Sequence, residues 1–203
     1  MTQTVTALYN TYDDAISATR ALEEAGIPAS EISVVSNNAD NRYNPDHTSN
    51  AAEDAGKGAG IGAVVGGIGG LLTGLGLMAI PGVGPVVAAG WLVATAVGAA
   101  GGAVVGGAAG GLVGSLTSAG VPEHDANFYA EGVRRGGTLV AARVPDGQAP
   151  LAREILGRYR WVDPAERRAA YRQSGWTTFD ENAPVYTPEQ IAAERARYTR
   201  EHV

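Results

Sequence analysis

The sequence predicts an α/β fold, more specifically a small α+β domain, that is split in two by a long glycine-rich insertion. Residues 1–37 have the pattern strand, helix, strand, and residues 121–163 have the pattern helix, strand, helix. Between these halves, residues 58–122 are 65 consecutive positions without Asp, Glu, Lys, Arg or His, and they hold 21 of the 29 glycines. We therefore expect one α/β domain that is interrupted by an apolar segment of a different kind.

The first half of the domain begins with a β-prone run at residues 4–9. Asn10 or Thr11 is placed to cap the helix that follows, and Gly26 is placed to end it. A second strand follows at residues 31–35, where apolar and polar residues alternate. Because a crossover helix commonly joins parallel strands, we expect these two strands to pair with each other in parallel.

The second half follows a polar linker at residues 38–57 and the glycine-rich block. Pro122 is placed at the start of a helix that Gly136 and Gly137 end. Residues 138–144 are the clearest strand in the chain, and residues 148–160 are expected to be helical. The three strands should form a small mixed sheet with the helices on one face.

The last segment, residues 164–203, carries scattered aromatic residues in polar sequence. Thr187 and Gln190 have the spacing of a capping box, which predicts a terminal helix. Its apolar side is narrow. We expect an arm that is anchored by aromatic side chains and packs either on its own domain or on a neighbouring subunit.

The glycine-rich block, residues 58–120, has a four-residue period in each of two arms. Each glycine lowers helix stability by about 0.8–1 kcal/mol relative to alanine, so close backbone packing must offset the loss. Strips of small residues at this spacing are typical of tightly packed helices. We therefore predict helix packing and oligomerisation through ten glycines: Gly58, Gly62, Gly66, Gly70, Gly74, Gly98, Gly102, Gly106, Gly110 and Gly114.

The two arms meet at a bend formed by Pro81, Gly82, Gly84 and Pro85, which rules out one continuous helix. We expect an antiparallel helical hairpin with arms at residues 58–80 and 86–119. At 1.5 Å per residue, these arms would be about 34 Å and about 51 Å long. Only the first matches the ~30 Å hydrocarbon core of a bilayer.

Two settings for this hairpin stay open: insertion in a lipid bilayer, which we favour, or packing inside a soluble homo-oligomer. Trp91 could anchor the hairpin at a membrane interface, and Arg134 and Arg135 could meet anionic headgroups. A core tryptophan and an ordinary helix end are the simpler interpretations of these residues. The start of the chain has no basic and apolar leader pattern, so we expect the cytoplasm or the cytoplasmic side of the inner membrane.

A family resemblance rests on three features: the first strand–helix–strand unit, the IPGVGP bend, and the stretch VPEHDANFYAEGVRRGGTLVAARV. Together they resemble the general stress protein 17M-like family of bacterial heat- and stress-induced proteins. The resemblance covers residues 4–145 and excludes the aromatic arm. It implies a small α/β domain and a stress-response context, and it supplies no catalytic residues.

The sequence offers no catalytic, cofactor or metal site. No glycine run completes a dinucleotide or phosphate-binding motif, there is no cysteine, and the three histidines are far apart in the chain. A net charge of −6 disfavours nucleic acid as a partner. We therefore expect a non-enzymatic stress-associated protein that binds itself, with a lipid bilayer as a second partner. A membrane-tethered regulatory or sensing α/β module is the alternative.

Overall fold

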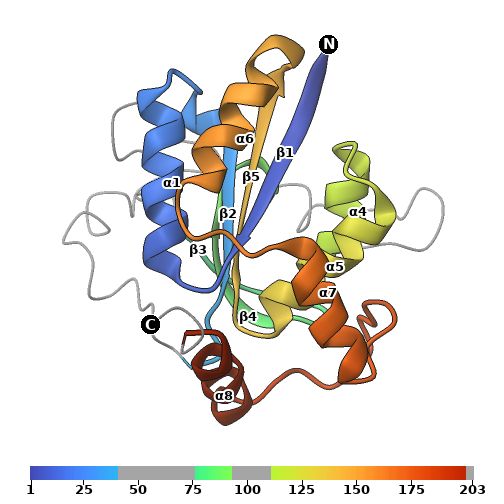
Figure 1. Cartoon of the computed structure of the whole chain (residues 1–203). Helices are drawn as coiled ribbons and strands as arrows, with labels where there is room; N and C mark the ends of the chain where they lie inside the picture. Colours follow the sequence, from blue (N-terminus) through green and yellow to red (C-terminus); the bar gives the residue numbers. More distant parts are fainter. Residues whose placement is uncertain (41–75, 93–110, 200–203) are drawn as a thin grey trace, which may run out of the picture.

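The computed structural model describes residues 1–40, 76–92 and 111–199 (Figure 1). The chain is mixed α/β, as the sequence predicts. The strands are β1 (Thr2–Tyr9), β2 (Ile32–Asn37), β3 (Gly76–Ile80), β4 (Gly84–Ala89) and β5 (Thr138–Pro145). The helices are α1 (Tyr12–Glu24), α4 (Gly111–Ser118), α5 (Glu123–Arg134), α6 (Ala149–Gly157), α7 (Pro164–Gln173) and α8 (Pro188–Thr199), with short 3-10 turns η1 (Ala29–Glu31) and η3 (Asp146–Gln148).

The sheet has the strand order β1-β5-β2-β4-β3, and every neighbouring pair is antiparallel. The expected parallel pairing of β1 with β2 is therefore wrong, because β5 lies between them. β5 takes an interior place between β1 and β2 because both of its sides are apolar: Leu139 and Ala141 are buried on one face, and Val140 and Ala142 on the other. A strand with no polar side is stable only where both faces of the sheet are covered.

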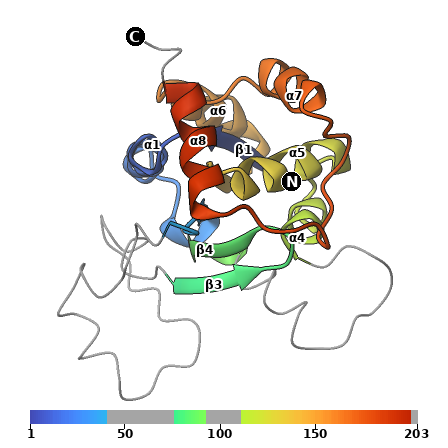
Figure 2. The same ribbon diagram turned by 90° about the horizontal axis from the view of Figure 1, so that it is seen from below.

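Helices cover both faces of the sheet, which corrects the expectation of helices on one face. α1 and α6 pack on one face, over Val5, Val34 and Val140. α4 and α5 pack on the other, over Leu8, Val35 and Leu139. Figure 2 shows this sandwich from one end, with β3 at the outer edge of the sheet.

The helix ends predicted from the sequence are confirmed for α1 and α5. Thr11 caps α1, since its hydroxyl accepts a hydrogen bond from the Asp14 amide at 3.2 Å. α5 ends at the glycine pair: the Gly136 amide donates to Val133 O, and the Gly137 amide donates to Gly132 O. Gly136 has a φ of 101°, a conformation that suits glycine.

The bend at Pro81, Gly82, Gly84 and Pro85 is confirmed, but it joins strands and not helices. The Val83 amide donates to Ile80 O at 3.1 Å, and Gly82 has a φ of 72°, so Pro81 and Gly82 are the central residues of a type II turn. β3 and β4 form a β-hairpin, and β4 joins the sheet by pairing with β2. The predicted helical hairpin is thus wrong for residues 76–80 and 86–89, which are strands.

The second predicted arm is not one continuous helix either. Its final part is helical as α4, but Gly111 has a φ of 76°, a left-handed conformation that interrupts a regular right-handed helix. α4 turns Leu112, Ser115 and Leu116 towards the domain core. The last part of the arm therefore belongs to the α/β domain.

The C-terminal arm packs on its own domain, which decides between the two expected placements for the described residues. Tyr171 of α7 is buried against Phe128 of α5, with ring centroids 6.0 Å apart. Thr187 and Gln190 form the predicted capping box, because the Thr187 amide donates to Gln190 Oε1 and the Gln190 amide donates to Thr187 Oγ1. α7, which the sequence did not indicate, lies ahead of this terminal helix.

Candidate functional site

A buried charge cluster lies at the C-terminal end of α5. The Glu131 side chain is 1% exposed and accepts two hydrogen bonds, from Arg135 Nε at 2.6 Å and from Arg134 Nη1 at 3.2 Å. The spacings of three and four residues place all three side chains on one side of the helix. One carboxylate thus serves two guanidinium groups inside the domain.

The same two arginines hold the C-terminal arm. Arg135 donates from Nη1 to Ser174 Oγ at 3.1 Å, and its guanidinium lies 4.3 Å from the centroid of the Tyr171 ring. Arg134 donates from Nη2 to Pro184 O at 2.9 Å. The cluster therefore connects α5 to two points of the arm that are ten residues apart.

α8 is fixed to the glycine turn after α5 by Arg195. Its guanidinium donates to Gly136 O at 2.8 Å, to Asn37 O at 3.0 Å, and to the carboxylate of Asp40. These contacts join the last helix to the end of β2 as well as to the end of α5.

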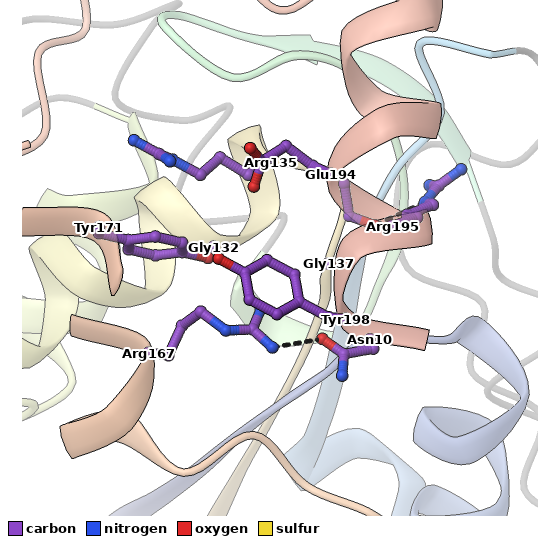
Figure 3. Close-up of a pocket in the computed structure, with 10 residues that line it drawn as sticks. Asn10, Gly132, Arg135, Gly137, Arg167, Tyr171, Glu194, Arg195 and Tyr198 are labelled. Carbon is purple, nitrogen blue, oxygen red and sulfur yellow. Dashed lines mark hydrogen bonds between the residues drawn. The ribbon is translucent and has the colours of Figure 1, made fainter. Parts of the chain in front are cut away.

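Arg167 of α7 lies at the same contact as Arg135 and Arg195 (Figure 3). It donates from Nη2 to Asn10 Oδ1 at 2.9 Å, and its guanidinium lies 3.3 Å from the centroid of the Tyr198 ring. Asn10 follows β1 directly, so this contact connects the start of the chain to its end.

These residues enclose a small polar hollow that is too narrow for a substrate. Its volume is about 10 Å³, which is room for about one water molecule. Glu194 lines it; its Oε1 pairs with Arg197 at 3.2 Å, and its buried Oε2 has no hydrogen-bond partner among the described residues. We conclude that the hollow is a packing feature and not a binding pocket for an organic ligand. It lies within the polar contact between α5, α7 and α8, which we call the polar joint and which is built by Glu131, Arg134, Arg135, Arg167 and Arg195.

Several pKa values at and near this joint are shifted, and burial acts on each of them. Burial by itself would lower the pKa of Arg135, but its hydrogen bond and ion pair with Glu131 reverse this, and the pKa is raised. Burial raises the pKa of Tyr171 well above its usual range, against the opposing effect of Arg167 and Arg135. Burial likewise raises the pKa of Tyr9, whose hydroxyl donates to Leu156 O at 2.8 Å.

These raised tyrosine pKa values predict loss of stability in alkali. Tyrosine in the unfolded chain ionises near pH 10. A folded chain that keeps Tyr9 and Tyr171 protonated above that pH binds more protons than the unfolded chain, so stability is full below about pH 10 and falls as pH rises further. We expect a titration of tyrosine absorbance to show two of the eight tyrosines ionising only together with unfolding. Tyr171→Phe should reduce that late step; a late step that is unchanged in Tyr171→Phe and in Tyr9→Phe would contradict the assignment.

The predicted anchors Trp91, Arg134 and Arg135 all have partners inside the domain. The Trp91 indole N–H donates to Glu31 O at 3.0 Å, and the Arg143 guanidinium lies 4.5 Å from the centroid of its ring. The Arg135 side chain is only 7% exposed. The interpretation of Arg135 as a contact for lipid headgroups is therefore wrong, since its guanidinium forms an ion pair with Glu131 and contacts the arm at Ser174 and Tyr171.

Most of the predicted glycine strip lies outside the described residues. Gly114 is half-buried in α4. The other nine strip glycines fall within residues 58–74 and 98–110.

Of the residues that build this joint, Arg134 and Arg135 were predicted in a different role, and Glu131, Arg167 and Arg195 were not predicted. Glu131, Arg134 and Arg135 carry a local signal, since a carboxylate three and four residues before two arginines is a recognisable helix pairing. Arg167 and Arg195 carry no such signal, because their partners Asn10 and Gly136 are distant in the chain.

The described residues contain neither a metal-binding cluster nor a membrane-spanning helix. No group of three or more His, Cys, Asp or Glu is placed to hold a metal ion in residues 1–40, 76–92 and 111–199. No helix in this part of the chain combines the length and apolarity needed to cross a bilayer.

Comparison of the chain with protein-family models, with curated proteins and with solved structures found no match. The resemblance to the general stress protein 17M-like family therefore stays a prediction from the sequence.

Proposed function

We propose that the chain is a non-enzymatic structural protein that associates with copies of itself through its glycine strips. The observation that carries the proposal is the recurrence of glycine at every fourth position in two charge-free segments, from Gly58 to Gly74 and from Gly98 to Gly114. Such strips allow close approach of backbones, and Val, Ile and Leu fill the positions between them. A flexible linker would not need these apolar residues.

The described strands between the two strips are compatible with this role. In the hairpin register Gly76 is opposite Ala88, and Trp91 lies three residues further on. Gly76 and Ala88 therefore lie side by side at the open end of the hairpin. The charged residues at the contact of α5, α7 and α8 are paired within the chain, so they do not compete with the glycine strips as the proposed contact.

Association through protein surfaces is favoured over a two-span bilayer hairpin. In a two-span hairpin, the bend would lie across the membrane from the domain. Here the Pro81–Gly82 turn is part of a hairpin whose strand β4 pairs with β2. The bend thus stays with the domain. A stress-related role, and a location in the cytoplasm or at the cytoplasmic side of the inner membrane, are part of the proposal and rest on the sequence alone.

The test is the size of the full chain in solution after two substitutions in the strips, Gly66→Leu and Gly106→Leu. Leucine prevents close backbone approach, so we expect large assemblies in the unchanged chain and a shift to small species in the double variant. The matched control is Val65→Leu with Val105→Leu, which adds bulk in the same segments but away from the strips. Equal assembly of both variants, or an unchanged chain that is monomeric at all concentrations, would refute the proposal.

Alkaline carbonate extraction distinguishes a protein assembly from insertion in a lipid bilayer. Large lipid-free particles in the soluble fraction would support a protein assembly. Retention in washed membranes together with loss of retention in the strip variant would support the bilayer as partner. Retention that does not change in the strip variant would favour a tethered regulatory or sensing module.

A further inference from the structure

β1 is an edge strand with an open side. It pairs only with β5 among the described strands, through residues 2–9. At the far end of the strand, the Val162 amide donates to Leu8 O at 2.7 Å, and Trp161 forms an isolated bridge with Tyr9. The chain after α6 therefore covers the edge at residues 8 and 9 and leaves the earlier part uncovered by this segment.

The direction of the backbone groups along β1 follows from two hydrogen bonds. Met1 O accepts from the Asp146 amide, on the β5 side, whereas Leu8 O accepts from Val162, on the open side. Backbone groups alternate in direction along an antiparallel strand. The amide and carbonyl groups of Thr4 and Thr6 therefore point to the open edge, and no hydrogen bond from the described residues to these backbone groups is found there.

A groove of about 420 Å³ runs along this open edge. Residues 4–7 of β1 form its floor, α5 supplies Asp125 and Tyr129 on one wall, and α6 supplies Arg153 and Leu156 on the other. Trp161 lines the groove and is 44% exposed. An edge with free backbone groups and an aromatic side chain beside it is a template for another strand.

The groove is complementary to itself. An antiparallel pairing of two β1 strands about a two-fold axis at Val5 places Thr4 opposite Thr6 of the other copy, with the outward backbone groups of both facing each other. No charged side chain is carried by residues 2–9, so no like charges meet across the pair. Asp125 is already neutralised by Arg168 in its own chain.

The flanking side chains fit the same register. Arg153 donates to Gln3 Oε1 at 2.5 Å, so it lies beside residue 3; among the described residues it has no ion-pair partner. Trp161 also lines the groove, at the end of the strand where it bridges Tyr9, and it lies near Gly157. In the register centred on Val5, Gln3 of one copy is opposite Ala7 of the other. The pairing therefore brings each Arg153 to the end of the groove that the exposed Trp161 of the other copy lines, where a cation and an aromatic face can pair favourably.

We propose that the open edge of β1 binds β1 of a second copy, which gives a two-fold dimer with a continuous sheet across both chains. This contact does not involve the glycine strips and does not depend on them. It would give the assembly a second, independent contact, so that copies joined through their glycine segments are also paired through their sheets.

Cysteine cross-linking tests the register directly, because the chain has no cysteine of its own. One full-length preparation carries Thr4→Cys and another carries Thr6→Cys. Opposed residues of a hydrogen-bonded antiparallel pair have Cα atoms about 5.5 Å apart, within disulfide range. Copies with the same substitution place their cysteines two residues out of register, which adds about 6.8 Å along the strand and exceeds that range. We expect several-fold more disulfide-linked dimer in the mixture than in either preparation alone.

Arg153→Ala in both preparations tests the flanking contact. Loss of two exposed cation–π contacts of about 0.5–1 kcal/mol each should weaken the dimer about 5–30-fold. Arg158→Ala is the matched control, since Arg158 pairs with Glu154 on the exposed side of the same helix and should leave the yield unchanged. A yield in the mixture no higher than in the separate preparations would overturn the proposal and leave the edge to a strand from another protein.

The same cross-link in a Gly66→Leu, Gly106→Leu background keeps the two proposals apart. Linkage that persists after the large assemblies disappear supports both contacts as independent. Linkage that is lost with them would overturn the β1 dimer as a contact of its own, even if the glycine strips assemble the chain as proposed.

Discussion

Glu131→Gln should destabilise the folded chain by about 3–5 kcal/mol, the range expected when one member of a buried ion pair loses its charge. The substitution keeps the shape of the side chain but leaves Arg134 and Arg135 without a carboxylate in a place where water cannot replace it. A domain is usually stable by about 5–15 kcal/mol, so the change removes a large part of the total. Urea unfolding followed by circular dichroism measures it.

Glu154→Gln is the matched control for this experiment. Glu154 pairs with Arg158 at the same 2.6 Å and the same four-residue spacing, but both side chains are more than half exposed. An exposed pair of this kind contributes well under about 1 kcal/mol. Equal effects of the two substitutions would show that burial of the cluster has no energetic consequence, against the structure.

Release of the C-terminal arm should accompany the Glu131→Gln effect. Arg134 and Arg135 reach Pro184 and Ser174 only while Glu131 orients them. Limited proteolysis should therefore cut the variant between α7 and α8 under conditions in which the unchanged chain and the Glu154→Gln control stay intact. Protection that is the same in all three would mean that aromatic packing alone holds the arm.

The local parts of the fold could be predicted because their causes are local. The Thr11 cap, the Gly136–Gly137 helix end and the Thr187 capping box each depend on residues within five positions of one another. The place of β5 between β1 and β2 depends on which strand both helix layers can cover. That is a property of the whole sheet, and it is not visible in the crossover pattern of residues 4–37.

The error at the bend has a cause that is visible in the sequence. The four-residue glycine period ends at Gly74, since the next position of the series is Met78, and it resumes only at Gly98. β3 and β4 lie in this interval, where Val86 and Val87 favour strand and the Pro81–Gly82 turn favours a hairpin. These local strand and turn signals outweigh the helical period on either side of the interval.

The polar joint was missed for a different reason. Its pairs join α5 to residues that lie 39 or more positions later, such as Ser174 and Pro184, and single-sequence patterns do not show such contacts. The charge pattern of α5 suggested an exposed helix end. What places Glu131 and Arg135 inside is the arm folding back over them.

Gly90→Ala should be the most damaging glycine substitution in the described sheet, with an expected loss of about 2–5 kcal/mol. Gly90 has a φ of 93°, which costs an L-residue about 1–2 kcal/mol. A Cβ atom there would also lie 2.2 Å from Ile32 O and 2.7 Å from Ser33 Cα. Both neighbours are backbone, so the end of β4 must move away from β2, at a further cost of about 1–3 kcal/mol.

Gly26→Ala separates these two contributions. Gly26 has nearly the same backbone angle, a φ of 87°, but a Cβ atom there meets nothing within 4 Å. It should lose only the conformational part, so the difference between the two variants in urea unfolding measures the close approach of β4 to β2. That approach also positions the Leu92 amide to donate to Ser33 Oγ at 3.0 Å. Equal losses would mean that β4 can shift without cost, and a hairpin that shifts so easily could not hold Gly76 and Ala88 in a fixed position beside β2.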